Sequence, residues 1–401
     1  MSTALLEGVR VLDLTNVLAG PFAGYQLALQ GADVVKVEMP GSGDLARQLG
    51  ADRALADELL GASFLAQNAG KRSVTLDLKD PEGREALLRA VREADVLLEN
   101  FRPGVMERLG LGWKTLRAEN PGLVYCAISG FGQTGPMRDR PAYDQIVQGL
   151  SGMMSVTGTE ETAPLRAGFP VADTLGGMAA AYAVAAALVR RGRTGEGAFV
   201  DVSMLEAALT AMGWVTSNYL ITGREPRPMG NENFTAAPSG TFATADGHLN
   251  IAANRQQQYA TLCRLIGRED LTSDPRFAHP ADRKAHREAL RVEVESALAA
   301  RPAVEWEEIL SDAGVPAARV LSVPEALGLD QLAARDFVLD LPFPDGRERP
   351  LSVLGSPVRV DGEPVRAPAP PPLLGEHTDA VLTELGYDRR RIAGLRERGA
   401  I

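Results

Sequence analysis

Short apolar runs and longer helical stretches alternate along the first half of the chain. The runs lie at residues 9–14, 32–38, 74–78, 95–100, 123–129 and 198–202, and their length and composition predict β-strands. The first two strands flank a helix that ends at Gly31, which makes a βαβ unit. Since strands that alternate with helices pair in parallel, the pattern predicts an α/β fold with a parallel sheet. Further helices are expected at about 45–62, 81–94 and 204–220.

The pattern changes after residues 224–229, a stretch with two prolines and two arginines that is typical of a linker. Two β-prone segments then flank Asp246-Gly247, a dipeptide that favours the turn of a β-hairpin. Amphipathic helices follow at 256–265, 286–300 and 304–313. Because 401 residues exceed the usual single core, we expect a second, smaller α+β domain over residues 225–320.

An apolar stretch, residues 178–189, follows Asp173 and the pair Gly176-Gly177. A helix that is apolar on every side is typical of the protein core. Asp173 stands where a helix N-cap is expected, and the far end carries the basic residues that the helix dipole favours there, Arg190, Arg191 and Arg193.

Asp173 has two interpretations. The first is a helix cap, since aspartate is a preferred N-cap residue. The second is a carboxylate nucleophile that carries acyl groups covalently. In that case, N–H groups at the helix start would keep the carboxylate ionised and lower its pKa. Gly176 and Gly177 would let a ligand or another backbone approach closely. The local sequence does not decide between the two.

Basic side chains gather near the predicted strand ends. The loop at residues 100–104 follows a strand, which is where ligands of open α/β sheets bind. Together the basic side chains would attract a phosphorylated ligand, although each one taken singly fits a solvated surface charge. They are Lys71, Arg72, Lys79, Arg102 and Arg108.

Composition excludes several classes of protein. A net charge of −10 disfavours a general nucleic-acid binder, and the first loop has no G-x-G-x-x-G motif for a dinucleotide. The only cysteines, Cys126 and Cys263, and four scattered histidines form no metal-ligand or disulfide pattern. No signal peptide or membrane-spanning window is evident, so we expect a cytoplasmic protein that binds no membrane.

Seven stretches, in order, resemble the family III CoA-transferases, which have the α-methylacyl-CoA racemases as relatives. They are GVRVLDLTNVLAGPFAG (8–24), GADVVKVEMPGSGD (31–44), NAGKRSVTLDLKDPEGRE (68–85), ADVLLENFRPGVMERLG (94–110), ISGFGQTGP (128–136), ADTLGG (172–177) and PLLGEHTDAVLTELG (372–386). The resemblance covers nearly the whole chain.

The resemblance implies a chemistry. Asp173 falls on the family's catalytic aspartate, which attacks an acyl-CoA thioester to give a mixed anhydride and then an aspartyl-CoA thioester. Tyr143 falls on a tyrosine beside this nucleophile. Coenzyme A is then a thioester substrate, with no tightly bound cofactor, and a small carboxylic acid is the acceptor. The positions that line the CoA site are Leu76, Lys79, Asn100, Phe101, Arg102 and Arg108.

The resemblance also implies an assembly. Family members are interlocked homodimers in which two ring-like chains thread each other. The N- and C-terminal segments, residues 1–224 and 321–401, would share a large Rossmann-like domain for CoA binding and catalysis. Residues 225–320 would form the small domain.

Departures from the family pattern bear on the substrate. Oxalate-using members carry glutamine where this chain has Leu18, and a glycine-rich run where it has residues 229–234. Oxalate and formate are therefore disfavoured, and succinate or a branched relative is preferred, with a carnitine-type acid still open. Asn254 and Arg255 fit either a second carboxylate site or a helix start. An acyl-CoA racemase is the alternative function, but racemases supply a histidine at the position of Tyr143.

Overall fold

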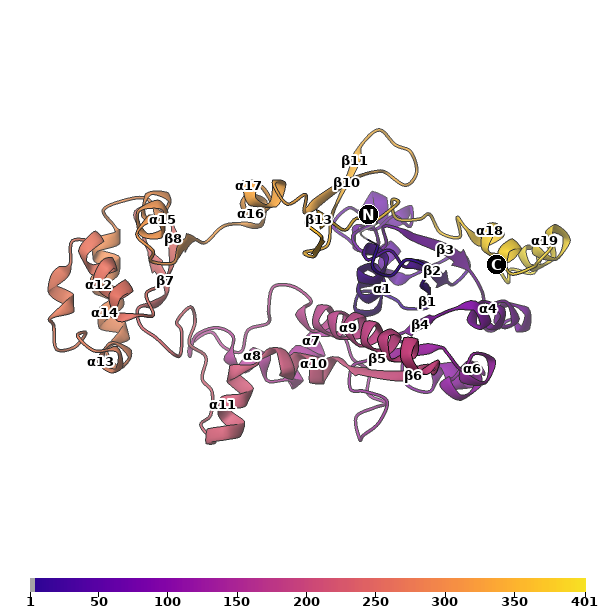
Figure 1. Ribbon diagram of the computed structural model, residues 1–401, viewed down its shortest axis with the longest axis horizontal. Helices are drawn as coiled ribbons and strands as arrows, with labels where there is room; N and C mark the ends of the chain where they lie inside the picture. Colours follow the sequence, from indigo (N-terminus) through magenta and orange to yellow (C-terminus); the bar gives the residue numbers. More distant parts are fainter. Residues whose placement is uncertain (1–3) are drawn as a thin grey trace. The chain divides into compact units, whose positions relative to one another are not determined.

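Six parallel strands form one sheet, in the order β3-β2-β1-β4-β5-β6 (Figure 1). The order reverses between β1 and β4, as in doubly wound α/β folds. Every neighbouring pair in this sheet is parallel, as the alternation of strands and helices predicts. The strands are β1 (Arg10–Asp13), β2 (Asp33–Glu38), β3 (Lys71–Thr75), β4 (Val96–Glu99), β5 (Val124–Ser129) and β6 (Ala198–Ser203).

The structure, a computed structural model, describes residues 4–401, which form two compact units. The first unit contains the six-stranded sheet and comprises residues 4–153, 166–224 and 330–401. The second unit comprises residues 154–165 and 225–329.

Helices cover both faces of the sheet. Consecutive strand residues such as Val11 and Leu12 point to opposite faces of the sheet and belong to two separate apolar clusters. Strands that are buried on both faces read as continuous apolar runs, which explains the pattern in the sequence. One face is covered by α4 (Pro81–Glu93), α6 (Trp113–Glu119), α18 (Thr378–Glu384) and α19 (Arg389–Glu397), and the other by α1 (Ala19–Leu29), α7 (Asp144–Leu150), α9 (Val171–Thr194) and α10 (Met204–Ala211).

The C-terminal segment completes the edge of the sheet at β3. The N–H of His377 donates to the carbonyl of Ser73 at 2.9 Å, and the N–H of Thr75 donates to the Thr378 hydroxyl at 3.0 Å. These bonds satisfy backbone groups that an edge strand would expose. Residues more than 300 positions apart in the sequence thus share one unit.

The long helix α9 is buried along one face only. Gly176, Ala180 and Val184 are buried, whereas the side chains of Met178 and Tyr182 are exposed in the single chain. The expectation of burial on every side was therefore wrong for the single chain. Among residues 4–401, α9 is also the one helix long and apolar enough, by these two criteria alone, to cross a membrane. This corrects the expectation that no such window exists.

Two glycines let neighbouring helices approach α9 closely. A Cβ atom at Gly177 would lie 2.5 Å from the carbonyl oxygen of Ala19, at the start of α1. A Cβ atom at Gly176 would lie 2.9 Å from Cγ of Met204, at the start of α10. Since real Cβ atoms do not come this close to other atoms, a side chain at 177 would displace the backbone of α1 and one at 176 would displace the Met204 side chain.

The second unit is a small α+β unit. The predicted hairpin is present as β7 (Ser239–Ala243) and β8 (His248–Ala252), and β9 (Ala317–Arg319) joins it as a third antiparallel strand. Its core lies between this sheet and the helices α12 (Gln256–Leu265), α14 (Arg287–Leu298) and α15 (Ala303–Asp312), with α13 (Pro280–Ala285) before α14.

Several element boundaries differ from the predicted ones. The stretch 45–62 contains only short pieces, η1 (Leu45–Gln48), α2 (Arg53–Asp57) and the first residue of α3 (Ala62–Leu65). The predicted helix 204–220 is two helices, because Gly213 adopts a φ of 44° between α10 and α11 (Trp214–Thr222). In the C-terminal part of the first unit, β10 (Val338–Pro342) pairs with β11 (Pro350–Leu354).

We predict that Gly177→Ala lowers the free energy of unfolding by about 1–3 kcal/mol, because the new methyl group overpacks the contact between α1 and α9. The matched control is Gly192→Ala in the same helix, where nothing lies within 4 Å of the added Cβ. This control should gain up to about 1 kcal/mol from helix propensity. Guanidinium unfolding followed by circular dichroism measures both, and equal stability of the two variants would contradict the close contact.

Candidate active site

The predicted site residues lie at one edge of the parallel sheet, where its strands end. Leu76 and Lys79 follow β3, residues 100–102 follow β4, and Arg108 ends the short helix α5 (Val105–Arg108). Asp173 lies in the first turn of α9. We call this side of the sheet the carboxyl edge. Ligands of open α/β sheets bind there, at the point where the strand order reverses.

The start of α9 is capped by Asp144 from another helix. Its carboxylate oxygen Oδ1 accepts the N–H of Ala172 at 2.8 Å and the N–H of Asp173 at 3.4 Å. Oxygen Oδ2 accepts a hydrogen bond from Nε2 of Gln148 at 2.7 Å and lies 4.0 Å from the guanidinium of Arg166. Asp144 is only 6% exposed, so these contacts hold the main chain of Asp173 in one position.

The side chain of Asp173 is unusual for an aspartate. Burial, together with the negative charge of Asp144, raises its pKa to about 7. No ion pair of Asp173 with a cation is present among residues 4–401. The carboxylate is therefore more basic than a solvated one, which makes it a stronger nucleophile once it is ionised.

Two expectations for Asp173 were wrong. It is not the N-cap residue, because α9 begins at Val171 and Pro170 precedes it. Its pKa is also raised and not lowered, since the N–H groups of the first turn are bonded to Asp144 and not to the Asp173 carboxylate. The residue that caps the start of α9 is Asp144.

Tyr143 immediately precedes Asp144 and forms the N-cap position of α7. Its side chain is 68% exposed in the single chain. Because Asp144 contacts the backbone of Asp173, Tyr143 lies in the same part of the first unit as Asp173.

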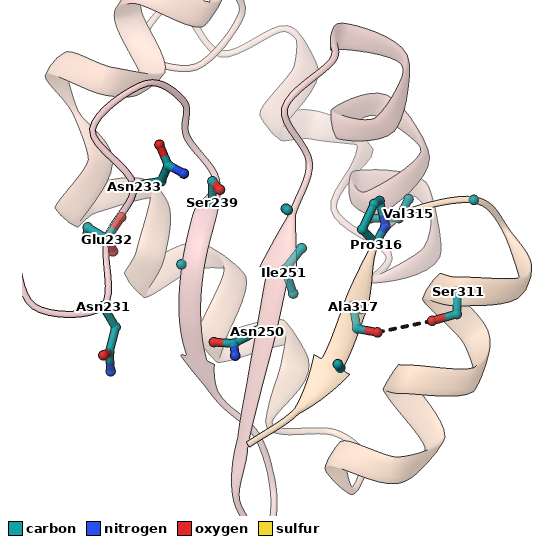
Figure 2. A pocket seen from close by; sticks show the side chains of 14 residues that line it. Asn231, Glu232, Asn233, Ser239, Asn250, Ile251, Ser311, Val315, Pro316 and Ala317 are labelled. Carbon is teal, nitrogen blue, oxygen red and sulfur yellow. Dashed lines mark hydrogen bonds between the residues drawn. The ribbon is translucent and has the colours of Figure 1, made fainter. Parts of the chain in front are cut away.

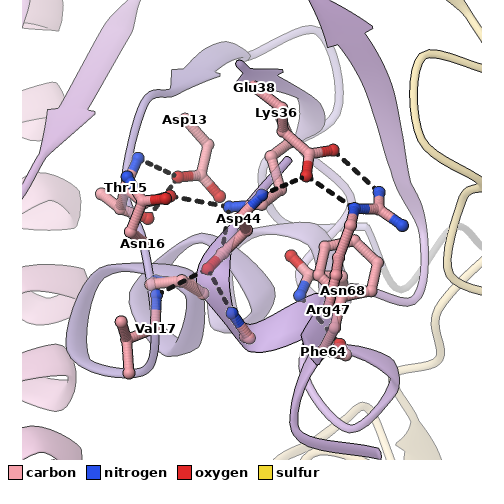
Figure 3. A network of polar contacts seen from close by, with 12 residues as sticks. Asp13, Thr15, Asn16, Val17, Lys36, Glu38, Asp44, Arg47, Phe64 and Asn68 are labelled. Atoms are coloured by element: carbon pink, nitrogen blue, oxygen red, sulfur yellow. Dashed lines mark hydrogen bonds and ion pairs between the residues drawn. The ribbon is translucent and has the colours of Figure 1, made fainter. Parts of the chain in front are cut away.

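The basic side chains fall into two groups. Lys79, Arg102 and Arg108 are exposed at the carboxyl edge and remain candidates for binding phosphate. Lys71 is no longer a candidate for binding phosphate, because it is buried and pairs with Asp13 at 2.8 Å. Figure 3 shows the position of Asp13. Burial lowers the pKa of Lys71 to about 8. Arg72 is bound by Asp33 and by Glu384, so it serves the C-terminal contact and not a solvent-facing site.

Three other predicted CoA-site residues are not fully exposed: Leu76 is buried, and Asn100 and Phe101 are half-buried. Leu76 is buried in a core cluster, and Phe101 packs against the same cluster. The amide of Asn100 bonds the main chain of Asn16, since its Oδ1 accepts the Asn16 N–H and its Nδ2 donates to the Asn16 carbonyl, both at 2.8 Å. Asn100 therefore connects the loop after β4 to the loop after β1.

Comparisons with known proteins bear on the whole chain. The sequence profile described as CoA-transferase family III matches residues 6–378. A protein named succinate–glutarate CoA-transferase, from Agrobacterium fabrum, is 40% identical over 388 residues, which cover 95% of each chain. The chain belongs to CoA-transferase family III. It is an enzyme, and its family uses CoA thioesters and carboxylic acids as substrates.

Two further relatives of this family III CoA-transferase extend the comparison. A protein named acetyl-CoA:oxalate CoA-transferase, from Acetobacter aceti, is 40% identical over 92% of each chain. The crystal structure of a CAIB/BAIF family protein from Brucella suis superposes with a TM-score of 0.84 at 35% identity, covering 96% of this chain and 100% of that one. The two named CoA-transferases are each 40% identical to this chain, so sequence identity does not indicate whether its acid substrate resembles glutarate or oxalate.

Sequence reasoning missed two buried acids of this CoA-transferase. It did not assign the cap of α9 to Asp144, because that bond joins residues 28 positions apart. It also passed over Glu99, whose pKa burial raises to about 7 and whose Oε2 accepts the Phe101 N–H at 2.8 Å. An acid at the end of an apolar strand was the available signal for Glu99.

The second unit of the CoA-transferase contains a cavity of about 640 Å³ (Figure 2). Its lining includes the polar side chains of Asn231, Glu232, Asn233, Ser239 and Asn250, and none of the predicted site residues. Arg255 stands at the start of α12, where its N–H donates to the side-chain oxygen of Gln258 at 3.1 Å. Of the two interpretations of Asn254 and Arg255, this arrangement fits a helix start.

We predict that Asp173→Asn stabilises the protein more as pH rises. The wild-type carboxyl holds a proton in the folded state up to about pH 7 but ionises near 3.8 when unfolded, so wild-type stability falls with rising pH in that window. The melting-temperature gap between Asp173→Asn and wild type should widen from pH 5 to pH 7 by an amount equivalent to about 2 kcal/mol, and then level off.

Gly192→Ala, which removes no titrating group, is the control for this measurement and should keep a constant gap to the wild type. Differential scanning fluorimetry in one buffer series measures all three proteins. A gap for Asp173→Asn that stays constant or narrows with pH would contradict a raised pKa.

Proposed function

We propose that this chain transfers CoA between carboxylic acids through covalent intermediates on Asp173. The observation that carries the proposal is the capped start of α9 at the carboxyl edge of the sheet. There Asp144 fixes the backbone of Asp173, and burial raises the pKa of its carboxyl to about 7. A carboxylate nucleophile needs such a fixed position and high basicity.

The steps balance in atoms and charge. An Asp173 carboxylate oxygen attacks the thioester carbonyl carbon of the donor, the C–S bond breaks, and CoA leaves as a thiolate. The thiolate then attacks the aspartyl carbonyl carbon of the mixed anhydride, which releases the donor acid as a carboxylate. The acceptor carboxylate displaces the thiolate to form a second anhydride. Finally, the thiolate attacks the acceptor acyl carbon, which gives the new acyl-CoA and restores Asp173.

Binding of CoA is assigned to the first unit. Lys79, Arg102 and Arg108 are exposed cations at its carboxyl edge and suit the phosphates of CoA. Leu76 and Phe101 support this edge through the core, and Asn100 supports it through Asn16. These roles are consistent with the family resemblance, with Leu76 and Asn100 acting through the backbone.

The acceptor is proposed to be a dicarboxylic acid, as succinate, glutarate and oxalate all are. Both named relatives act on acids of this class according to their names. Arg166 is an exposed cation 4.0 Å from Asp144 and therefore near Asp173, where it suits a second carboxylate. Leu18 and residues 229–234 still favour succinate or a branched relative over oxalate.

A racemase is the less favoured alternative. Exchange of an α-proton needs an acid–base pair that titrates near neutral pH, which a tyrosine such as Tyr143 serves poorly. His377 is the one histidine in the sequence of the first unit, and its Nδ1 accepts the N–H of Ser73 at the β3 edge.

We predict that succinyl-CoA without an acceptor acid labels Asp173. Hydroxylamine or borohydride should trap the acyl or thioester adduct, and mass spectrometry of the peptide that contains residue 173 should locate it. Asp173→Ala should lower the transfer rate at least 1,000-fold, since no other carboxylate occupies this position, while the fold is retained because Asp144 provides the cap.

Asp388→Asn is the matched control, because Asp388 caps α19 on the opposite face of the sheet from α9. This variant should be labelled at Asp173 like the wild type. Full transfer activity of Asp173→Ala would refute the proposed mechanism.

The proposal includes an interlocked homodimer. Apolar side chains of α9 and α11 are strongly exposed in the single chain, among them Tyr182 (78%), Trp214 (77%) and Ile221 (81%). Exposed apolar surface of this kind is typical of a protein–protein interface, and a second copy of this chain would cover it.

We predict a dimer by light scattering even at low concentration, with very slow exchange of subunits, because threaded chains cannot separate without unfolding. Ile221→Glu should sharply reduce the yield of dimer. Val292→Glu, a change at a 64% exposed position of α14 in the second unit, should not. A monomer with native activity would rule out the interlocked form.

A further inference from the structure

The loop after β1, residues 15–18, lies where the strand order of the sheet reverses. Its residue Val17 has a φ of 69°, in the left-handed region. This region is unfavourable for a β-branched side chain and persists only where the surrounding structure holds it. Strained residues of this kind cluster at functional sites, which prompts the question of what holds this one.

Side chains bond every main-chain polar group of Thr15, Asn16 and Val17. Six groups in succession are thus fixed by buried or half-buried partners from five other positions, of which Figure 3 labels Asp13, Lys36 and Asp44. The Thr15 N–H donates to Asp13 (3.0 Å) and its carbonyl accepts from Lys36 (2.8 Å), both Asn16 groups bond Asn100, the Val17 N–H donates to Asp44 (2.8 Å), and its carbonyl accepts from Gln67 (3.3 Å).

Asp44 connects this loop to the buried charges. Its Oδ1 accepts the N–H groups of Val17 and Ala46, at 2.8 and 2.9 Å, and its Oδ2 pairs with Nζ of Lys36 at 2.9 Å. Both side chains of this ion pair are fully buried. A carboxylate offers oxygen in both directions, whereas an amide offers it in only one.

The loop leads into α1, which packs against the helix that carries Asp173. Gly177 packs directly on the carbonyl of Ala19, the first residue of α1, which follows the loop. Asp173 precedes Gly177 by four residues and so lies on the same face of α9, one turn nearer its start. Since α1 and α9 both follow strands of the parallel sheet at its carboxyl edge, we infer that this turn faces the loop that precedes α1.

We propose that Asp44 is a positioning residue for acyl transfer to Asp173. It holds Val17 in the left-handed conformation, and through Val17 it sets the position of the loop beside Asp173. The bonds between Asn16 and Asn100 extend this frame to the loop after β4, where CoA binding is assigned. This inference rests on the proposed function and adds a residue that touches neither substrate nor Asp173.

A purely structural role for Asp44 is the competing explanation, because any buried ion pair that loses one partner destabilises the fold. The two explanations differ at Val17. Glycine adopts a φ of 69° without strain, so a glycine at position 17 no longer needs Asp44 to hold it there. A glycine at position 17 cannot replace the lost ion pair between Lys36 and Asp44, so it would not rescue a purely structural defect.

The experiment measures the rate of covalent labelling of Asp173 at saturating succinyl-CoA in wild type, Val17→Gly, Asp44→Asn and the double variant. Asp44→Asn should label at least 10-fold more slowly, because its single amide oxygen can serve Val17 or Lys36 but not both. Val17→Gly should stay within 3-fold of wild type, and the double variant should recover to within 3-fold of Val17→Gly.

Leu59→Gly is the matched control, since Leu59 also has a positive φ (60°) but lies outside the loop. Added to Asp44→Asn, it should restore nothing. Amide hydrogen exchange gives a second readout, in which the peptide containing Val17 should exchange at least 10-fold faster in Asp44→Asn than in wild type.

Normal labelling of Asp44→Asn, or slow labelling that Val17→Gly does not rescue, would overturn the inference. An unlabelled wild type would instead refute the proposed function, and this inference with it. If Asp44→Asn does not fold, Gln67→Met takes its place, because it removes only the partners of the carbonyls of Val17 and Ser63. Its labelling should be at least 3-fold slower and should recover with Val17→Gly.

Discussion

Several charged side chains of the parallel sheet and its loops are withdrawn from water, and a withdrawn charge is costly unless it has a partner. Three buried ion pairs meet this need in the first unit. Burial alone would raise the pKa of Asp13, but Lys36 and Lys71 outweigh it and the pKa is lowered. The pKa of Glu38 is lowered in the same way, against burial, by Arg47. The pairs are Asp13–Lys71, Lys36–Asp44 and Glu38–Arg47.

Asp173 and Glu99 depart from this rule, since among residues 4–401 neither forms an ion pair with a cation and burial raises the pKa of each to about 7. Burial and the negative charge of Asp144 both raise the pKa of Asp173. The helix that carries Asp173, α9, packs against α1 and the sheet. In the mechanism that we propose, this carboxylate is pre-organised for attack, since its surroundings stabilise its position more than its charge. The paired charges give rigidity, and we propose that the Asp173 carboxylate, which has no cation partner, gives reactivity.

The family III CoA-transferase thus combines two levels of structure at one edge. The parallel sheet brings the loops after β1, β3 and β4 to the same side, where exposed cations suit a phosphorylated ligand. Side-chain bonds then connect these loops, as Asn100 does for Asn16. Glycines at 176 and 177 bring the helix of Asp173 up to this edge.

Local pattern was sufficient for much of the fold. The apolar runs indicated the strands, their alternation with helices indicated parallel pairing, and Asp246-Gly247 indicated the hairpin, because each of these depends on residues close in sequence. The single helix predicted over residues 45–62 was wrong, since Gly50 and Leu59 adopt positive φ values and separate the short helical pieces. The motifs also identified the family and directed attention to Asp173.

The sequence by itself determined the element types, the parallel sheet, the hairpin and the family. Only the tertiary structure decided how the charged residues are used. It gave the cap of α9 to Asp144, buried Lys71 against Asp13, and raised the pKa of Asp173 instead of lowering it. The reason is that desolvation and pairing depend on which distant residues pack around a charge, and sequence spacing carries no record of that.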